Sequence, residues 1–407
     1  MPETSIKLEG FTESVIRMMT RVANEYGAIN LSQGFPDFDP PPAILDALAK
    51  AAYEGPHQYE VTWGSQLFRE KLAAKQTRLM GIEIDPDKNI VVTCGSTEAM
   101  MTAMLTVCNP GDKVVVFSPF YENYGADAIL SGADPVFVPL VPPTFTFDPA
   151  VLEAAIAGGA CGDHAGALTD KAGAKALILC NPSNPSGKVF TKEELETIAA
   201  LAIKYDLFVI TDEVYEHIVY KPYKHIYIAS LPGMAERTIS CSSLSKTYSI
   251  TGWRLGYVIA SEAVISGAKK VHDFLTVGAP APLQKAAVTG LEFGDDYYES
   301  LLDEYTRKKN LFLGGLDEAG LTYYEPQGAY YVLVDIENIN PFETDGEYCL
   351  WLAKNVGVAA VPGSSFFKED VNRYIRFHFA KKDETLRAAI ERLSVLKNEK
   401  YSSTSFK

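Results

Sequence analysis

The sequence is poor in positive charge. It contains 37 Lys and Arg against 52 Asp and Glu, which gives a formal net charge of -15 over 407 residues. Proteins that bind nucleic acid need a basic face to neutralise the phosphates. The charge balance therefore argues against a nucleic-acid partner.

Long apolar runs are also missing. No apolar stretch approaches the ~18 residues that a membrane-spanning helix needs. Residues 1–10 lack the apolar centre of a secretory signal peptide. We therefore expect a soluble, cytoplasmic protein with no membrane partner.

Cysteine is scarce, and its few copies are scattered. No two of them form a C-x-x-C pair, and several lie in apolar, strand-like segments: Cys94, Cys108, Cys161, Cys180, Cys241 and Cys349. This distribution predicts buried free thiols in a reducing compartment, with neither a disulfide framework nor a metal site.

Apolar residues, in contrast, are plentiful. They make up 47% of the chain and charged residues 22%, which is enough for a large buried core. The length suggests more than one domain. We predict an N-terminal segment over residues 1–44 that joins a small domain over 295–407, and a large ligand-binding domain over 45–294.

Strand-like and helix-like segments alternate through the predicted large domain. Helical periodicity marks 43–53, 66–79 and 100–107, and Thr191 with Glu194 forms a capping-box pattern before a further helix. The expected strands lie at 89–94, 113–118, 135–139, 175–180, 207–211, 237–241 and 254–260. The alternation predicts an α/β fold with a mostly parallel seven-stranded sheet covered by helices.

Polar or aromatic side chains stand just past several of these strands. They are Ser96, Tyr121, Asn184, Asp212 and Lys246. Ligands of such sheets bind beyond the carboxyl ends of the strands, so we expect these side chains to share one site. The turn Gly95-Ser96-Thr97 could bind an anion at a helix N-terminus, although an ordinary helix cap explains it as well.

The stretch 241–257 reads C-S-S-L-S-K-T-Y-S-I-T-G-W-R-L-G-Y and holds a lysine among hydroxyl side chains. A buried ammonium is costly, but a lysine that forms a Schiff base escapes much of that cost and is a nucleophile. Arg254, eight residues after Lys246, offers a fork of donors suited to a phosphate. The pattern suggests pyridoxal phosphate, while a hydroxyl-rich turn with a surface lysine is the alternative.

The part of the chain beyond residue 294 has a different pattern. Helices are expected at 295–315 and 384–396, and strands at 328–334 and 373–379, which together form a smaller α+β domain. Arg376 lies inside the apolar strand 373–379. Its side chain either faces solvent or points into the cleft between the domains as a carboxylate clamp.

Each candidate has a role in amine chemistry on a pyridoxal ring. Lys246 would bind the cofactor and move a proton, and Asp212 would pair with the ring nitrogen unless it merely ends a strand. Tyr215 and Asn184 would donate to the ring's phenolic oxygen, and Tyr121 would stack on the ring. The phosphate would be held by Ser96, Thr97, Ser243 and Arg254.

Three motifs in order, N-P-S-N-P-S-G at 181–187, D-E-V-Y at 212–215 and S-L-S-K at 243–246, resemble the class I and II aminotransferases of fold type I, the aspartate aminotransferase superfamily. The resemblance implies a homodimeric enzyme that uses pyridoxal 5′-phosphate. It also implies that Arg376 binds the substrate α-carboxylate and that the backbone of Gly34 approaches this carboxylate. Tyr59 would reach the phosphate of the cofactor bound to the partner subunit. Gly95 belongs to the phosphate turn.

The motifs Q-G-F-P-D-F and P-G-S-S-F-F are similar to the kynurenine, glutamine, methionine and aromatic branch of this family. We therefore expect transfer of an amino group from an L-amino acid to a 2-oxo acid by a ping-pong mechanism. Alternatives on the same scaffold are an aspartate-type aminotransferase and a C–S β-lyase. A non-enzymatic regulator is disfavoured by the acidic charge.

The preferred side chain is predicted from missing cations. Neither 271–280 nor the loop 34–42 contains an arginine for a distal carboxylate. Apolar surface could come from Phe35, Phe38, Trp63 and Phe366. This favours aromatic or large neutral amino acids, unless Arg17, Arg21 or Lys270 enters the pocket.

Overall fold

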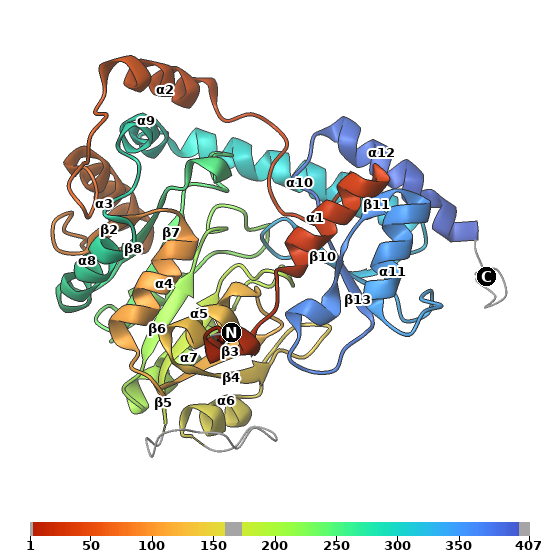
Figure 1. Ribbon diagram of the computed structural model, residues 1–407, viewed down its shortest axis with the longest axis horizontal. Helices are drawn as coiled ribbons and strands as arrows, with labels where there is room; N and C mark the ends of the chain where they lie inside the picture. The colour runs from red at the N-terminus through yellow and green to blue at the C-terminus, as the bar shows by residue number, and fades with distance from the viewer. Residues whose placement is uncertain (1–2, 159–172, 399–407) are drawn as a thin grey trace.

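A seven-stranded sheet forms the centre of the larger part of the molecule in the computed structural model, which describes residues 3–158 and 173–398 (Figure 1). Its strands follow the order β2-β8-β7-β6-β5-β3-β4. Their bounds are β2 Ile90–Thr93, β3 Lys113–Ser118, β4 Asp134–Pro139, β5 Ala174–Cys180, β6 Phe208–Asp212, β7 Thr238–Ser243 and β8 Gly256–Ile259.

The strands from β3 to β7 pair in parallel, and β8 runs antiparallel between β2 and β7. The predicted seven strands and the mostly parallel sheet are thus confirmed. Because the parallel strands end at the same edge, the segments that follow β3, β5, β6 and β7 meet there.

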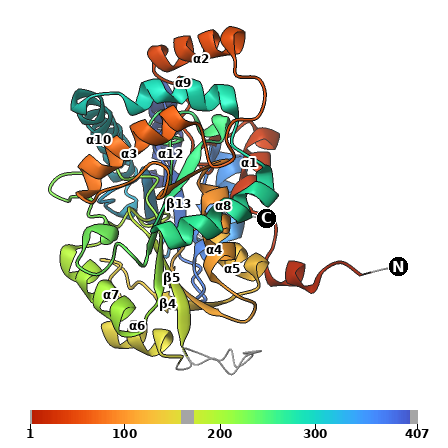
Figure 2. The same ribbon diagram turned by 90° about the vertical axis from the view of Figure 1, so that its left-hand side faces the viewer.

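Both faces of this sheet are buried, as its near-continuous apolar strands require. Val114 and Val116 pack on one face, and Val115 and Phe117 on the other, because side chains alternate along a strand. Figure 2 shows the helices α4 (Ser96–Val107), α5 (Asn123–Ser131) and α8 (Glu262–Thr276) on one side, and α6 (Pro149–Ile156) and α7 (Lys192–Lys204) on the other.

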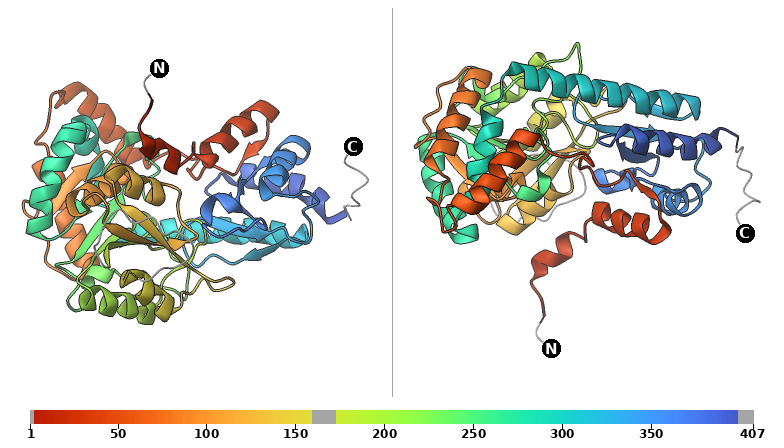
Figure 3. Two further views of the ribbon diagram at one scale, coloured as in Figure 1. Left: turned by 60° about the horizontal axis from the view of Figure 1, so that its bottom comes forward. Right: turned by 90° about the horizontal axis from the view of Figure 1, so that it is seen from above.

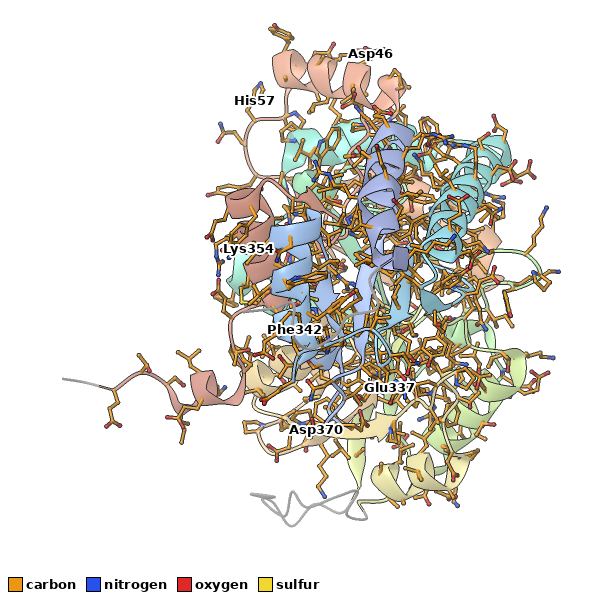
Figure 4. All side chains as sticks on the ribbon, turned by 90° about the vertical axis from the view of Figure 1, so that its right-hand side faces the viewer. Asp46, His57, Glu337, Phe342, Lys354 and Asp370 are labelled. Carbon is orange, nitrogen blue, oxygen red and sulfur yellow. The ribbon has the colours of Figure 1, made fainter. Side chains whose placement is uncertain are left out.

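Three more helices cover the end of the sheet at β2. They are α2 (Pro42–Glu54), α3 (Gln66–Met80) and α9 (Ala281–Leu291), which share an apolar cluster with Ile90 and Val92. α2 lies at the outer edge of the molecule, where Asp46 and, in the loop after it, His57 point away from the body (Figure 4).

The C-terminal part is built on a four-stranded antiparallel sheet in the order β12-β13-β10-β9. Its strands are β9 Thr322–Tyr324, β10 Tyr331–Asp335, β12 Val361–Pro362 and β13 Tyr374–His378. The long helix α10 (Asp295–Glu318) and α12 (Asp383–Leu393) pack against each other beside it, and α11 (Asp345–Trp351) contacts β12 and β13.

The N-terminal segment contacts both parts of the molecule (Figure 3). Its 3₁₀ turn η1 (Ile6–Gly10) packs on α5, whereas α1 (Val15–Tyr26) lies against β11 (Val358–Ala359) and β12, and β1 (Ile29–Asn30) pairs in parallel with β11. The division at residues 44 and 294 stays a proposal: α10 begins at Asp295, just after the second position, whereas α2 already begins at Pro42 and so crosses the first.

Several element ends differ from the sequence prediction. α4 begins at Ser96 rather than at 100, because the hydroxyl-rich turn is itself the first helical turn. β10 begins at Tyr331 rather than at 328, since Ala329 has a φ of +57° and leaves the extended conformation. The last helix ends at Leu393, a 3₁₀ turn follows to Asn398, and Ile390 is only half-buried.

The described cysteines are free thiols. Cys108, Cys241 and Cys349 are buried as predicted, whereas Cys94 and Cys180 are only partly buried. Cys161 lies outside the described residues. Across 3–158 and 173–398, none of the helices is long and apolar enough to cross a bilayer.

The capping box of α7 gives a stability prediction. Thr191 Oγ1 accepts from the Glu194 N–H, and Glu194 accepts from the Thr191 N–H. Thr191→Ala should lower the free energy of unfolding by about 1 kcal/mol because it leaves helix donors unsatisfied. The midpoint of urea unfolding measures this.

Thr197→Ala on the same helix is the matched control. Thr197 Oγ1 donates to the Glu193 carbonyl in the helix interior, where alanine is the better helix former. Equal destabilisation by the two substitutions would contradict a capping role for Thr191.

Candidate active site

The polar residues at the carboxyl edge of the large sheet line one cavity of about 170 Å³. Residues from β13 and the N-terminal segment complete its wall. The sequence-predicted members that line it are Gly34, Ser96, Thr97, Tyr121, Asn184, Asp212, Tyr215, Ser243, Lys246, Arg254 and Arg376. Two predicted residues lie outside this lining, Gly95 behind Arg254 and Tyr59, which is 86% exposed.

One end of the cavity is built to receive an anion. α4 begins there without a side-chain cap, since its N-cap residue Gly95 has a φ of +83° and offers none. The first N–H groups of the helix are therefore available. The hydroxyl groups of Ser96, Thr97 and Ser243 line the same end.

Arg254 supplies the positive charge at this end. It follows the 3₁₀ turn Thr251–Trp253 and has a φ of +55°, a conformation that costs energy for a residue other than glycine. Its guanidinium donates to the carbonyls of Thr251 at 3.1 Å and Cys94 at 3.4 Å. Within 3–158 and 173–398, no carboxylate lies at salt-bridge distance from it, so an anion could bind there.

Gly95 is required by this packing. A Cβ atom at Gly95 would lie 2.4 Å from Nη2 of Arg254. A side chain at this position would therefore displace the guanidinium from the turn.

Lys246 follows β7 and projects into the cavity lining. Its Nζ donates to the Gly34 carbonyl at 3.1 Å. The pKa of Lys246 is lowered to about 8, mainly by the loss of water and also by repulsion from Arg254 and Arg376, while Asp212 acts in the opposite direction. The amine is therefore partly neutral near physiological pH, which a nucleophile or base needs.

Asp212 ends β6 and is buried at the same edge. Its Oδ2 accepts from the Tyr124 hydroxyl at 2.7 Å, and Oδ1 is 3.4 Å from the Val214 N–H. Burial raises the pKa of Asp212, and these donors, together with the charge of Lys246, only partly offset it. A cationic donor beside Asp212 would stabilise its carboxylate.

Arg376 is completely buried on β13, which decides between its two predicted environments. Its guanidinium lies between the rings of Tyr331 and Phe366, at 4.3 and 4.5 Å. It donates to Asn184 Oδ1 at 2.7 Å and to the Ser32 carbonyl at 2.8 Å, and its Nε has no hydrogen-bond partner among the described residues. Burial lowers the pKa of Arg376. A carboxylate would supply the missing charge partner.

Tyr215 and Tyr331 meet across the two parts of the molecule. Their hydroxyl oxygens are 2.9 Å apart. A Cβ atom at Gly34 would lie 2.1 Å from the Tyr331 hydroxyl, so the approach of the N-terminal loop to the cavity requires glycine.

Sequence reasoning missed several lining residues, of which Tyr124 and Tyr331 matter most. Tyr124 lies three residues after Tyr121, in the first turn of α5, and that proximity could have suggested it. Tyr331 had no local signal. The other missed members are Ser14, Ile16, Gln33, Glu122, Val214, Ser245 and Thr251.

The expected apolar wall is only partly correct. Phe35 lines the cavity, and Phe366 reaches it only through Arg376. Phe38 instead packs on Tyr305 in the core, with ring centroids 6.2 Å apart, and Trp63 lies under the Lys269 ammonium at 4.5 Å. Neither of these two residues lines the cavity of this chain.

The three candidate cations are now distinguished. Arg17 lines the cavity, and no ion pair of its side chain is found among the described residues. Arg21 is paired with Glu13 at 2.7 Å on the surface. Lys270 is exposed on α8 and does not line the cavity.

The residues present fit pyridoxal 5′-phosphate. An anion site at the α4 N-terminus, a partly neutral lysine and a buried carboxylate needing a cationic donor match the cofactor's phosphate, aldehyde and ring nitrogen. Arg376 lines the same cavity and matches a substrate carboxylate. The roles of individual residues stay predictions.

Comparison with known proteins agrees with this fit. The sequence model described as aminotransferase class I and II matches residues 26–393. Methionine aminotransferase of Escherichia coli is 35% identical over 391 residues, which are 96% of this chain and 97% of that protein. Human kynurenine–oxoglutarate transaminase 1 is 33% identical over 428 residues, 97% of this chain and 98% of that protein.

A solved structure is similar over the whole fold. N-succinyldiaminopimelate aminotransferase from Mycobacterium tuberculosis is 36% identical and superposes with a TM-score of 0.90. The match covers 97% of this chain and 100% of that chain.

The environment of Lys246 predicts a pH dependence for the cofactor-free protein. Lys246 should titrate with a pKa of about 8, whereas a lysine in the unfolded chain titrates near ~10.4. The folded protein then binds fewer protons between these values, so the contribution of Lys246 to stability rises with pH across this window. An NMR titration of the Lys246 amine measures the pKa, and Lys246→Met identifies its signal.

Asp212→Asn tests whether the neighbouring charges help to set the pKa of Lys246. Removing this carboxylate should move the Lys246 pKa further below its ordinary value, because Asp212 is the group that raises it. An amine of Lys246 that titrates like a free lysine in the unmutated protein would contradict the description.

Proposed function

The chain belongs to the class I and II aminotransferases, the pyridoxal-phosphate-dependent enzymes of fold type I, and we propose roles for its residues in amino-group transfer. The reaction moves the amino group of an amino acid to a 2-oxo acid. The observation that carries the assignment of the site is the meeting of Lys246, Asp212 and Arg376 in one cavity.

Bound pyridoxal phosphate supplies an aldehyde that accepts amino groups and a ring that delocalises negative charge. Ser96, Thr97, Ser243 and Arg254 would bind its phosphate, with the turn at Gly95 and the α4 N-terminus. Asp212, held by Tyr124, would keep a proton on the ring nitrogen.

Lys246 is the proposed covalent attachment point and base. Once the substrate amine has displaced it, Lys246 would take the proton from the substrate Cα. It would then deliver this proton to the cofactor carbon that receives the amino group. Its lowered pKa of about 8 keeps a neutral fraction available for this step. Tyr215 and Asn184 would donate hydrogen bonds to the ring oxygen, and Tyr121 would stack on the ring.

Arg376 would orient the substrate by binding its α-carboxylate. The guanidinium is held between two rings and donates to Asn184, the residue that is also proposed to contact the cofactor ring. The backbone of Gly34 lies close to Lys246 and would border the same carboxylate.

The proposed assembly is a homodimer in which Tyr59 reaches the partner's phosphate. Support comes from exposed aromatic and aliphatic side chains near Tyr59. Phe274 is 91% exposed, Leu275 and Val277 are also exposed, and the Thr62 hydroxyl lies 3.4 Å from Asp273 on the same helix end. A cytoplasmic location stays a prediction.

The proposed amino donor is an aromatic or large neutral L-amino acid. Phe35 contributes an aromatic wall, and the relatives include proteins named for methionine and kynurenine. Arg17 is the one lining residue, among those the structure describes, that offers a cation besides Arg254, Arg376 and Lys246. It is therefore the residue to test for recognition of a distal carboxylate.

Covalent attachment tests the central assignment. Borohydride reduction of the holoenzyme should leave the pyridoxyl label on Lys246, because among the described lysines this amine alone combines a lowered pKa with a place in the cavity lining. Peptide mapping locates the label. A label on another lysine would refute the assignment, and pyruvate release without an acceptor acid would favour the β-lyase.

Specificity is tested with aspartate, phenylalanine and methionine and a common acceptor. We expect kcat/KM to be at least about tenfold higher for phenylalanine and methionine, since an unpaired, desolvated carboxylate costs more than ~1.4 kcal/mol. Arg17→Gln should leave this ratio nearly unchanged. The surface variant Arg21→Gln is the control.

An advantage for aspartate that disappears in Arg17→Gln would overturn the neutral preference. It would make Arg17 the distal carboxylate binder. The same advantage persisting in that variant would point to a cation from the partner subunit.

A further inference from the structure

A fully buried histidine links three segments around the anion end of the cavity. His272 lies on α8 and is 0% exposed. Its Nδ1 is 2.6 Å from Glu98 Oε1, and its Nε2 is 2.9 Å from the Thr62 carbonyl oxygen. Glu98 belongs to the first turn of α4, and Thr62 to the loop that carries Tyr59.

Both contacts require the histidine to donate. A carboxylate and a carbonyl are acceptors, whereas a neutral imidazole has one N–H and one acceptor nitrogen. Thr276 Oγ1, 3.3 Å from Nδ1, gives its own proton to Glu98 at 2.7 Å and can only accept from the ring. A neutral ring would place a lone pair against an acceptor without access to water.

Glu98 transmits this contact to the anion-binding turn. Its second carboxylate oxygen accepts the N–H of Cys94, the residue before Gly95, and the Cys94 carbonyl accepts from Arg254. Burial by itself would raise the pKa of Glu98, but the hydrogen bond and charge of His272 and the donors of Cys94 and Thr276 bring it below its ordinary value. Glu98 is thus an anionic acceptor facing the ring of His272.

The other nitrogen fixes the loop of Tyr59. Thr62 is held through its carbonyl by His272 and through its hydroxyl by Asp273 at 3.4 Å. The next residue, Trp63, accepts from the Val92 N–H in β2. The exposed Tyr59 therefore projects from a loop whose base is tied to α8 and to the sheet.

Few other charges compete for His272. Glu98 is the single titratable side chain of α4, and β2 has none. The other charged groups on its own helix are Glu262, Lys269, Lys270 and Asp273, and the adjoining loop and turn carry Glu60, Cys94 and Arg254. Because a buried unpaired charge is strongly unfavourable, the proton on His272 and the charge on Glu98 depend on each other.

We propose that His272 is a buried imidazolium that acts as a positioning residue, fixing the anion-binding turn of α4 relative to the loop of Tyr59. His272 does not line the cavity and acts through Glu98 and Thr62. Its effect on the cofactor rests on the proposed function, in which this turn and Tyr59 bind the phosphate from two subunits.

The protonation state is measured by ¹⁵N NMR of the histidine rings in the full-length protein, with His272→Gln assigning the signal. We expect both ring nitrogens of His272 to carry N–H groups, in the absence and in the presence of pyridoxal phosphate. A single protonated nitrogen at neutral pH would overturn the proposal. The result does not depend on enzyme activity.

Glu98→Gln provides a second signature if His272→Gln does not fold. Its amide nitrogen donates to Nδ1, so His272 should become neutral with its one proton on Nε2, facing Thr62. A ring that keeps two N–H groups in this variant would contradict the dependence on Glu98.

The positioning role is measured by equilibrium dissociation of pyridoxal phosphate and by hydrogen exchange of 59–64 and 94–98. His272→Gln should weaken cofactor binding about tenfold and speed exchange in both segments, because a charge-assisted link is lost. Thr276→Val, which removes one donor to Glu98 but keeps the ion pair, should change the affinity less than about twofold. Unchanged affinity and exchange in His272→Gln would refute the role.

Failure of this inference and failure of the proposed function give different results. A native protein that does not bind pyridoxal phosphate contradicts the proposed function but leaves the NMR test intact. Normal cofactor binding with a neutral His272 contradicts the inference alone.

Discussion

The removal of charged groups from water is the constraint on which this site depends. Burial is the largest influence on Lys246, Asp212 and Arg376, lowering the pKa of the lysine and the arginine and raising that of the aspartate. Each is only partly compensated by its neighbours. The folded chain therefore keeps several incompletely paired charged groups in one cavity. A cofactor with a phosphate and a basic ring nitrogen, together with a substrate carboxylate, would supply the missing charge partners.

The sheet supplies the rigid frame that sustains this cost. Asp212 and Lys246 leave adjacent parallel strands, β6 and β7, at the same edge, and α4 begins beside them. Arg376 comes from a different sheet and is held by two aromatic rings and by Asn184. The apolar clusters on both faces of the large sheet fix these positions, so the charged groups cannot relax toward solvent.

A second layer of contacts holds the residues that bind the ligand. Tyr124 orients Asp212, Tyr331 meets Tyr215, and His272 joins the turn of Glu98 to the loop of Tyr59. These supporting residues have no motif of their own. The chain separation is 88 residues between Tyr124 and Asp212, 116 between Tyr215 and Tyr331, and 174 between Glu98 and His272. Local periodicity does not encode contacts between residues so far apart.

The sequence by itself determined the α/β alternation, the strands of the large sheet, the capping of α7 and the motif residues around Lys246, because these depend on short-range pattern and on residue chemistry. The tertiary structure alone decided that β8 is antiparallel, that Arg376 is buried, that Arg17 rather than Arg21 or Lys270 lines the cavity, and that Phe38 and Trp63 do not. Those outcomes depend on which distant segments pack together. Burial and pairing then set the charge state of each group, since both are properties of the folded neighbourhood rather than of the residue.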